Sequence, residues 1–201
     1  MLDLKNPVDV VKVEISKKTV EFKINKIFLD PSGRHLLINS VQGETLYLYR
    51  GWKKPKPLKR FTSSKLVIDS VAWNRHTLFN PKHSMLTGSF LVGTRGGAIY
   101  EACLDAEDDF FKSQEKLLKL VFNLPDRQPA TGIMFENFPP SDGRKCLVIL
   151  TTPSRIYQFT GVSDRQSADG SEAFTSLFSK YRDLAPGIVC MPSRSVSHIW
   201  R

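Results

Sequence analysis

The chain has 201 residues and a formal net charge of +9, and its composition, 41% hydrophobic and 24% charged, is that of a globular protein. A largely disordered chain is excluded, because such chains carry fewer apolar and aromatic residues. The N-terminus lacks the apolar stretch of a signal peptide, and no run of 18 apolar residues occurs, so we expect neither a secreted nor a membrane-spanning protein.

The first elements in chain order are predicted strands. Apolar and polar residues alternate over residues 11–15 and 22–25, which indicates half-buried strands. Asp30-Pro31-Ser32-Gly33 then separates two apolar runs, residues 27–29 and 36–38. Pro at the second position and Gly at the fourth predict a type I turn in which Asp30 accepts backbone hydrogen bonds. Residues 44–49 supply the next strand of this unit.

A basic segment follows at residues 50–65, where seven Lys and Arg residues flank Trp52 and Phe61. Pro55 and Pro57 predict an extended, unpaired loop, whose cations either stay solvated or contact an acidic partner. The two aromatic residues are either exposed anchors or part of the core. Nucleic acid is a weaker alternative to an anionic membrane surface, because no RNA-binding signature accompanies the segment. The candidate partner-binding residues are Arg50, Trp52, Lys53, Lys54, Lys56, Lys59, Arg60 and Phe61.

An internal repeat organises the rest of the chain. Leu91-Val92-x-Thr94-x4-Ile99-Tyr100 matches Val148-Ile149-x-Thr151-x4-Ile156-Tyr157 without a gap, at an offset of 57 residues. A third copy, one residue longer, begins at Leu37. Each copy reads as strand, tight turn and aromatic-bearing strand. This predicts an all-β partial propeller of about three to four blades; three unrelated hairpins in a sandwich or barrel are the alternative.

Two segments carry helical signals. Apolar residues at positions 174, 177, 178 and 181 form one stripe, which predicts a short helix over residues 172–181 near the C-terminus that covers a blade. Residues 109–120 fit either a short helix or an interrupted strand.

The search for chemistry predicts no enzyme, with no catalytic, cofactor-binding or metal-binding residues. Cys103 and Cys146 lie in apolar runs and are expected to be buried thiols, and with Cys190 they form no CxxC pair, which favours a reducing cytosolic compartment. The four histidines show no metal-binding spacing and are expected at the surface or in loops. Gly93-x-x-Gly96-Gly97 lies between two strands and is expected to form a tight turn, not a dinucleotide-binding loop.

The run Lys26-Ile27-Phe28-Leu29-Asp30-Pro31-Ser32-Gly33-Arg34-His35-Leu36-Leu37-Ile38 resembles the Deep orange family of class C vacuolar protein sorting subunits, shared by the HOPS and CORVET tethering complexes. Further similar segments follow in the family's order over about residues 20–185. They are residues 46–48, 57–58, 67–74, 91–102, 151–159 and 174–181.

The resemblance implies a non-enzymatic scaffold in endosome-to-vacuole (lysosome) transport, vesicle docking and membrane tethering before SNARE-driven fusion. It implies a cytoplasmic protein, peripheral on late endosomes and vacuoles, whose partners are the other class C subunits. Family members continue into an α-solenoid and a RING-type zinc domain, so residues 1–201 are expected to be an incomplete N-terminal propeller domain without those parts. No cofactor, small-molecule substrate or nucleic acid is expected. A generic propeller adaptor unrelated to membrane traffic is the alternative function, and a basic nucleic-acid-binding module a weaker one.

Overall fold

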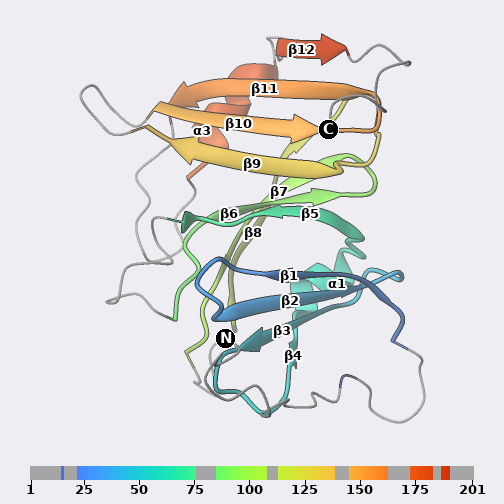
Figure 1. Ribbon diagram of the computed structural model, residues 1–201, viewed down its shortest axis with the longest axis vertical. Coiled ribbons are helices and arrows are strands. Elements are labelled where there is room, and N and C mark those ends of the chain that lie inside the picture. Colours follow the sequence, from blue (N-terminus) through green and yellow to red (C-terminus); the bar gives the residue numbers. More distant parts are fainter. Residues whose placement is uncertain are drawn as a thin grey trace, which may run out of the picture.

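The computed structural model describes residue 15 and residues 22–75, 85–107, 113–138, 145–162, 173–182 and 187–190. Its strands form three four-stranded antiparallel sheets, stacked one above another in Figure 1. The strand expected over residues 11–15 lies outside the described residues apart from Ile15, which belongs to no strand.

Each sheet is an up-and-down meander, in which every strand pairs with its neighbours in sequence. We call the sheets blade 1, blade 2 and blade 3. Blade 1 holds β1 (Ile24–Leu29), β2 (His35–Ser40), β3 (Thr45–Tyr49) and β4 (Lys56–Pro57). Blade 2 holds β5 (Ile68–Ala72), β6 (Phe90–Thr94), β7 (Ala98–Leu104) and β8 (Glu115–Asn123). Blade 3 holds β9 (Gly132–Asn137), β10 (Lys145–Thr151), β11 (Arg155–Val162) and β12 (Gly187–Cys190).

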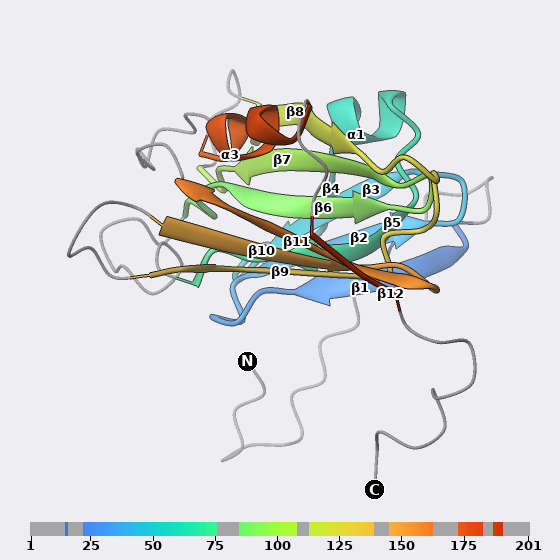
Figure 2. The same cartoon turned by 90° about the horizontal axis from the view of Figure 1, so that it is seen from above.

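The three sheets are successive blades of a partial β-propeller, as the repeat predicted. The matching sequences fall on the two middle strands of each blade, namely β2–β3, β6–β7 and β10–β11. The first strands of successive blades lie against one another, with β5 in contact with both β1 and β9. In Figure 2 the β1 and β9 strands lie on one side of the molecule, and α1 and α3 lie on the opposite side with β7 and β8.

The predicted turn in blade 1 is built around Asp30, whose side chain is only 2% exposed. Its carboxylate accepts hydrogen bonds from the backbone N–H groups of Ser32 at 2.9 Å, Arg34 at 2.7 Å and His35 at 2.6 Å. Gly33 closes the turn with its N–H on the Asp30 carbonyl and adopts a positive φ of 69°. The hairpin thus has the hydrogen-bonded Asp and the Gly that its sequence predicted.

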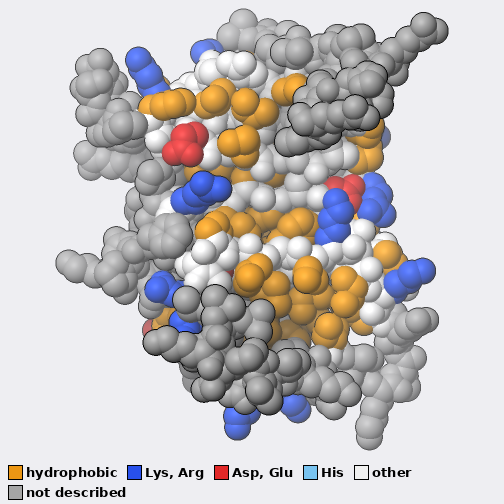
Figure 3. Space-filling view, in the orientation of Figure 1, with side chains coloured by type: hydrophobic (Ala, Val, Ile, Leu, Met, Phe, Trp, Pro, Cys, Tyr) orange, Lys and Arg blue, Asp and Glu red, His pale blue; other side chains and the backbone are white. Residues whose placement is uncertain are grey.

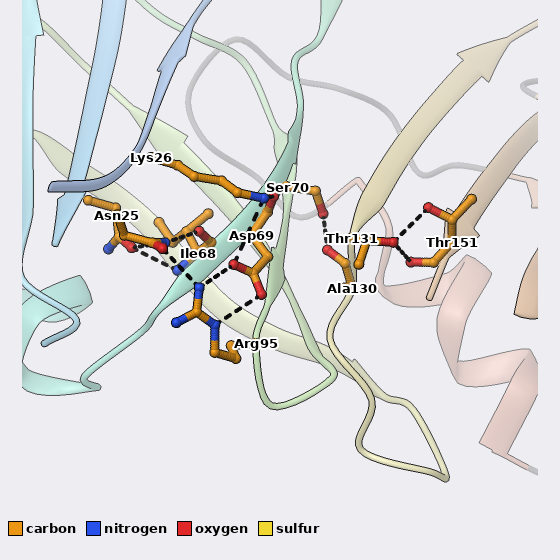
Figure 4. Close-up of polar contacts among 10 residues, drawn as sticks. Asn25, Lys26, Ile68, Asp69, Ser70, Arg95, Ala130, Thr131 and Thr151 are labelled. Carbon is orange, nitrogen blue, oxygen red and sulfur yellow. Dashed lines mark hydrogen bonds and ion pairs between the residues drawn. The ribbon is translucent and has the colours of Figure 1, made fainter. Parts of the chain in front are cut away.

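Polar side chains join the blades at their inner strands (Figure 4). Between blades 1 and 2, the Arg95 guanidinium of blade 2 donates to the Asn25 side-chain oxygen of blade 1 at 2.8 Å, and it is held in place by a 2.9 Å hydrogen bond to the Asp69 carboxylate of its own blade. Between blades 2 and 3, the Ser70 hydroxyl donates to the Ala130 carbonyl at 2.6 Å. These contacts fix the relative positions of neighbouring blades.

Each seam between blades has its own hydrophobic core. The cluster between blades 1 and 2 includes Leu37, Tyr47 and Phe90, and the cluster between blades 2 and 3 includes Ile99 and Val148. Fully buried aromatic rings fill both clusters, as expected where two twisted sheets pack face to face.

The C-terminal helical segment packs as predicted but is shorter. It consists of α3 (Thr175–Ser179) and the 3-10 turn η2 (Lys180–Arg182). Phe174, Leu177 and Phe178 are buried in the second cluster, and α3 contacts both β8 and β11. The ambiguous segment at residues 109–120 resolves as strand where it is described, because β8 begins at Glu115.

Three observations differ from the sequence expectations. A helical turn, α1 (Lys59–Ser63), and the short strand β4 lie in the segment expected to be an unpaired loop. His35 was expected at the surface or in a loop but is fully buried in β2, where its Nδ1 lies 2.7 Å from the Tyr47 hydroxyl. Gly93 belongs to β6 and not to the following turn. His76, His83 and His198 lie outside the described residues.

Candidate functional site

The basic segment forms the outer edge of blade 1, which we call the basic edge: residues 50–65, comprising the β3–β4 turn, β4 and α1. Five of its eight candidate residues are exposed, two are partly buried and one is buried. The exposed side chains are Arg50, Lys53, Lys54, Lys59 and Arg60. Trp52 and Lys56 are partly buried, and Phe61 has no exposed surface.

Local hydrogen bonds give this segment its shape. The turn after β3 closes through the Trp52 N–H on the Tyr49 carbonyl at 2.9 Å, and Gly51 takes a positive φ of 93°. The chain then pairs with β3 for two residues, with Pro57 opposite Leu46. Proline is tolerated here because β4 is an edge strand, so its missing N–H breaks no central ladder.

Phe61 is a core residue and not an exposed anchor. Its ring is 0% exposed and belongs to the cluster that contains Leu37, Tyr47 and Leu58. Of the two alternatives for Phe61, exposed anchor or core residue, the structure shows the second. The buried ring attaches α1, and with it the basic edge, to the body of the molecule.

Trp52 is partly buried, so it is neither a fully exposed anchor nor a core residue. Its ring makes edge contacts with Tyr47 and Tyr49, at centroid distances of 5.4 and 6.0 Å. The Lys56 ammonium lies over the ring, 4.2 Å from its centroid. These contacts hold the indole in place. Because Trp52 is partly buried, only part of its ring surface is accessible to a partner.

No local pattern in the sequence marks the residue that positions α1. Glu115, in β8 of blade 2, accepts hydrogen bonds from the backbone N–H groups of Arg60 at 2.8 Å and Phe61 at 3.1 Å. The carboxylate satisfies N–H groups that the first turn of a helix leaves without partners. Because Glu115 is 54 residues from Phe61, no local pattern could have predicted this contact.

Cys103 and Cys146 are placed as expected for inert thiols. Cys103 and Cys146 are buried, and burial raises the pKa of Cys103 to about 11 and that of Cys146 to about 12. A thiolate is the reactive form, so neither group is set up as a nucleophile near neutral pH. Within the described ranges, no group of three or more His, Cys, Asp or Glu side chains could hold a metal ion. No helix in the described part of the chain is long and apolar enough to cross a membrane.

The sequence also predicts two further partner-contact loops, residues 75–88 and 104–116, because loops on a rigid scaffold commonly carry function. Residues 76–84 and 108–112 lie outside the described residues, so these two predictions are not tested by the structure.

The fold and the site together define a β-propeller protein with a basic outer edge. Residues 1–199 match the family described as Pep3/Vps18/deep orange beta-propeller domain, and the chain belongs to this family. It is 32% identical over 196 residues to Vacuolar protein sorting-associated protein 18 homolog of Danio rerio, and 30% identical over 179 residues to Vacuolar sorting protein 18 of Arabidopsis thaliana.

These alignments cover most of this chain but a small part of each relative. They span 95% of the chain and 19% of the zebrafish protein, and 87% of the chain and 16% of the Arabidopsis protein. The Drosophila melanogaster homologue is 29% identical over 154 residues, which are 69% of the chain and 14% of that protein. The chain thus spans less than a fifth of the length of these relatives.

Proposed function

We propose that this chain is the propeller portion of a non-enzymatic scaffold subunit in a membrane-tethering complex of the HOPS and CORVET type. The observation that carries the proposal is the family match over residues 1–199, which coincides with a propeller fold. The relatives are named for vacuolar protein sorting. The process is then endosome-to-vacuole (lysosome) transport, with docking of vesicles before fusion.

The physical mechanism is passive. Two buried seams hold the blades as a rigid body, and exposed loops and edges present side chains to other proteins. Binding energy in such interfaces comes from a few well-packed anchors, and no chemical step is required of the propeller. The protein acts at the cytoplasmic face of late endosomes and vacuoles as a peripheral component, and its partners are the other class C subunits.

Affinity capture from cell lysate with the 201-residue chain as bait tests this proposal. Other class C subunits, identified by mass spectrometry, are expected to be enriched on the bait. Because the chain is basic, with a pI of about 9.5, the control bait is an unrelated β-propeller of similar pI. A bait that is folded by circular dichroism and recovers no such subunit above this control contradicts the proposal.

A further inference from the structure

The basic edge concentrates the charge excess of the whole chain. Residues 45–68 hold seven Lys and Arg and no Asp or Glu, whereas the rest of the chain has 22 Lys and Arg against 20 Asp and Glu. The net charge of the protein is therefore mostly a property of one edge of blade 1. In Figure 3, Lys and Arg side chains are visible at the lower end of the molecule, where Figure 1 places β4 and the turn before it.

Six of the seven cations of the basic edge have exposed side chains in the described part of the chain. Among the described residues, no carboxylate forms an ion pair with the six exposed cations of the basic edge; these are Arg50, Lys53, Lys54, Lys59, Arg60 and Lys65. The nearby carboxylate of Glu115 is only 7% exposed, and it accepts hydrogen bonds from the backbone of α1. It supports the helical turn that carries Lys59 and Arg60 instead of pairing with their side chains.

The cations are carried on a fixed support. β4 is paired with β3, and α1 is held by Phe61 in the core and by Glu115 at its first turn. An array of like charges on a rigid edge creates a local positive potential that attracts an extended anionic surface.

The residue types favour a lipid surface over nucleic acid. Five of the seven cations are Lys, which acts as a flexible point charge, and two are Arg, whose planar fork suits bidentate phosphate recognition. Recognition of single-stranded nucleic acid needs aromatic faces on which bases stack. Phe61 is buried, and the Lys56 ammonium lies over the ring of Trp52. A partly exposed Trp beside several Lys is instead typical of residues at a membrane–water interface.

We propose that the basic edge docks the propeller onto an anionic lipid surface, with Lys53, Lys54 and Lys59 as principal contacts and Trp52 at the headgroup level. This inference rests on the proposed function, because a tethering subunit acts at a membrane. It assigns the membrane contact to residues 50–65 of blade 1.

Vesicle flotation with the 201-residue chain tests the proposal, because bound protein rises with the vesicles while aggregated protein sinks. The chain is expected to float with vesicles of phosphatidylcholine and phosphatidylserine, and not with phosphatidylcholine alone. The interaction is expected to weaken as salt is added, since ions screen surface charges. Equal binding to both vesicle types overturns the proposal.

A matched pair of variants locates the contact. Each basic residue near an anionic membrane strengthens binding roughly fivefold, so the triple variant K53Q/K54Q/K59Q is expected to lose on the order of 100-fold in affinity. The control triple K145Q/K180Q/R182Q removes the same charge from exposed positions on β10 and η2, away from the basic edge, and is expected to keep most of the binding. An equal loss in both triples means that net charge alone causes binding, and overturns the assignment.

Two further readouts separate the alternatives. The first compares two competitors, a single-stranded RNA oligonucleotide and the soluble headgroup of phosphatidylserine, by the concentration at which each displaces the chain from vesicles. Displacement by the RNA at the lower concentration would identify a nucleic-acid surface and overturn the proposal. Affinity capture with the K53Q/K54Q/K59Q variant is expected still to recover class C subunits. The two ideas are thus tested separately. Absence of flotation with anionic vesicles would overturn the membrane contact, whereas failure of the unaltered chain to capture class C subunits would overturn the proposed function.

Discussion

Two buried glutamates of blade 2 hold two helical segments that lie far away in the sequence. Glu115 accepts hydrogen bonds from the first turn of α1, and Glu101 accepts them from the N–H groups of Ala173 and Phe174 just before α3. Neither helical turn has a side-chain cap of its own at its N-terminus. The last two strands of blade 2, β7 and β8, thus supply the caps that the helices lack.

Replacing Glu101 by Gln is expected to destabilise the protein by about 1.5–3 kcal/mol, the usual range for a hydrogen bond to a charged group. The amide keeps the shape of the side chain, but its NH₂ group faces a backbone N–H and cannot accept from it. Chemical denaturation followed by circular dichroism measures the change. The control is Glu136→Gln, at an exposed position of β9, where a change within about 0.5 kcal/mol is expected; equal effects of the two substitutions would contradict the capping role.

The buried thiols predict a loss of stability at alkaline pH. Burial raises the pKa of Cys103 from 9.0 to about 11 and that of Cys146 from 9.0 to about 12, so the folded state holds both protons longer than the unfolded state does. Their contribution is complete below pH 9 and is lost as the pH rises towards 11–12, because only the unfolded thiols ionise there. The free energy of unfolding, measured from pH 8 to 11, should fall less steeply in the C103A/C146A variant. Parallel pH profiles would contradict this prediction.

At the scale of elements, two turns of the blades require glycine for different reasons, one for its backbone angle alone and the other also for close packing. Gly33 and Gly97 both have positive φ, 69° and 77°. A Cβ on Gly33 would have no neighbour within 4 Å, whereas one on Gly97 would lie 2.8 Å from the Gln128 carbonyl oxygen. The first turn therefore needs glycine for its backbone angle, and the second needs it also for the close approach of the chain that leads into blade 3.

These two glycines form a matched test. Gly33→Ala is expected to cost about 1–2 kcal/mol, the ordinary penalty of a left-handed backbone for a residue with a Cβ. Gly97→Ala is expected to cost clearly more, because backbone atoms must also move. Urea denaturation of both variants measures the difference in the free energy of unfolding. A smaller effect at Gly97 would mean that the backbone of residues 127–128 moves at little energetic cost, and would contradict the close packing at this point.

At the scale of the whole molecule, the three blades leave apolar side chains exposed on the outer blades. Ile27 and Leu29 of β1 are 63% and 59% exposed, and Met134 of β9 is 57% exposed. Figure 3 shows hydrophobic side chains gathered over this face. On blade 3, Phe138, Leu147 and Val162 help to line an open, mostly apolar cavity of about 480 Å³. Exposed apolar surface of this kind favours association.

The 201-residue chain is therefore expected to self-associate when it is produced alone. Size-exclusion chromatography with light scattering is expected to give a mass above 22.8 kDa that rises with concentration. The I27S/L29S variant should shift the distribution towards the monomer, because both side chains are exposed and their replacement removes little core packing. A monodisperse monomer of the unaltered chain with a cooperative thermal transition would contradict this expectation.

The sequence by itself determined the elements whose signals are local. The alternation of apolar residues located most strands, the Asp30–Gly33 turn was read from its residue types, and the 54- to 57-residue repeat identified the blades because equivalent middle strands need the same apolar residues. The apolar stripe at residues 174–181 placed the C-terminal helix for the same reason. The position of the basic segment was evident from composition alone.

Only the tertiary structure decided what depends on residues far apart in the chain. β4 is too short for a periodicity signal and forms because β3 offers it an edge, and α1 forms with a cap from Glu115 of another blade. The burial of Phe61 and His35 follows from the packing of blade 2 and Tyr47 against them. The energy of such contacts comes from surfaces that meet only after folding, so no window of neighbouring residues can reveal them.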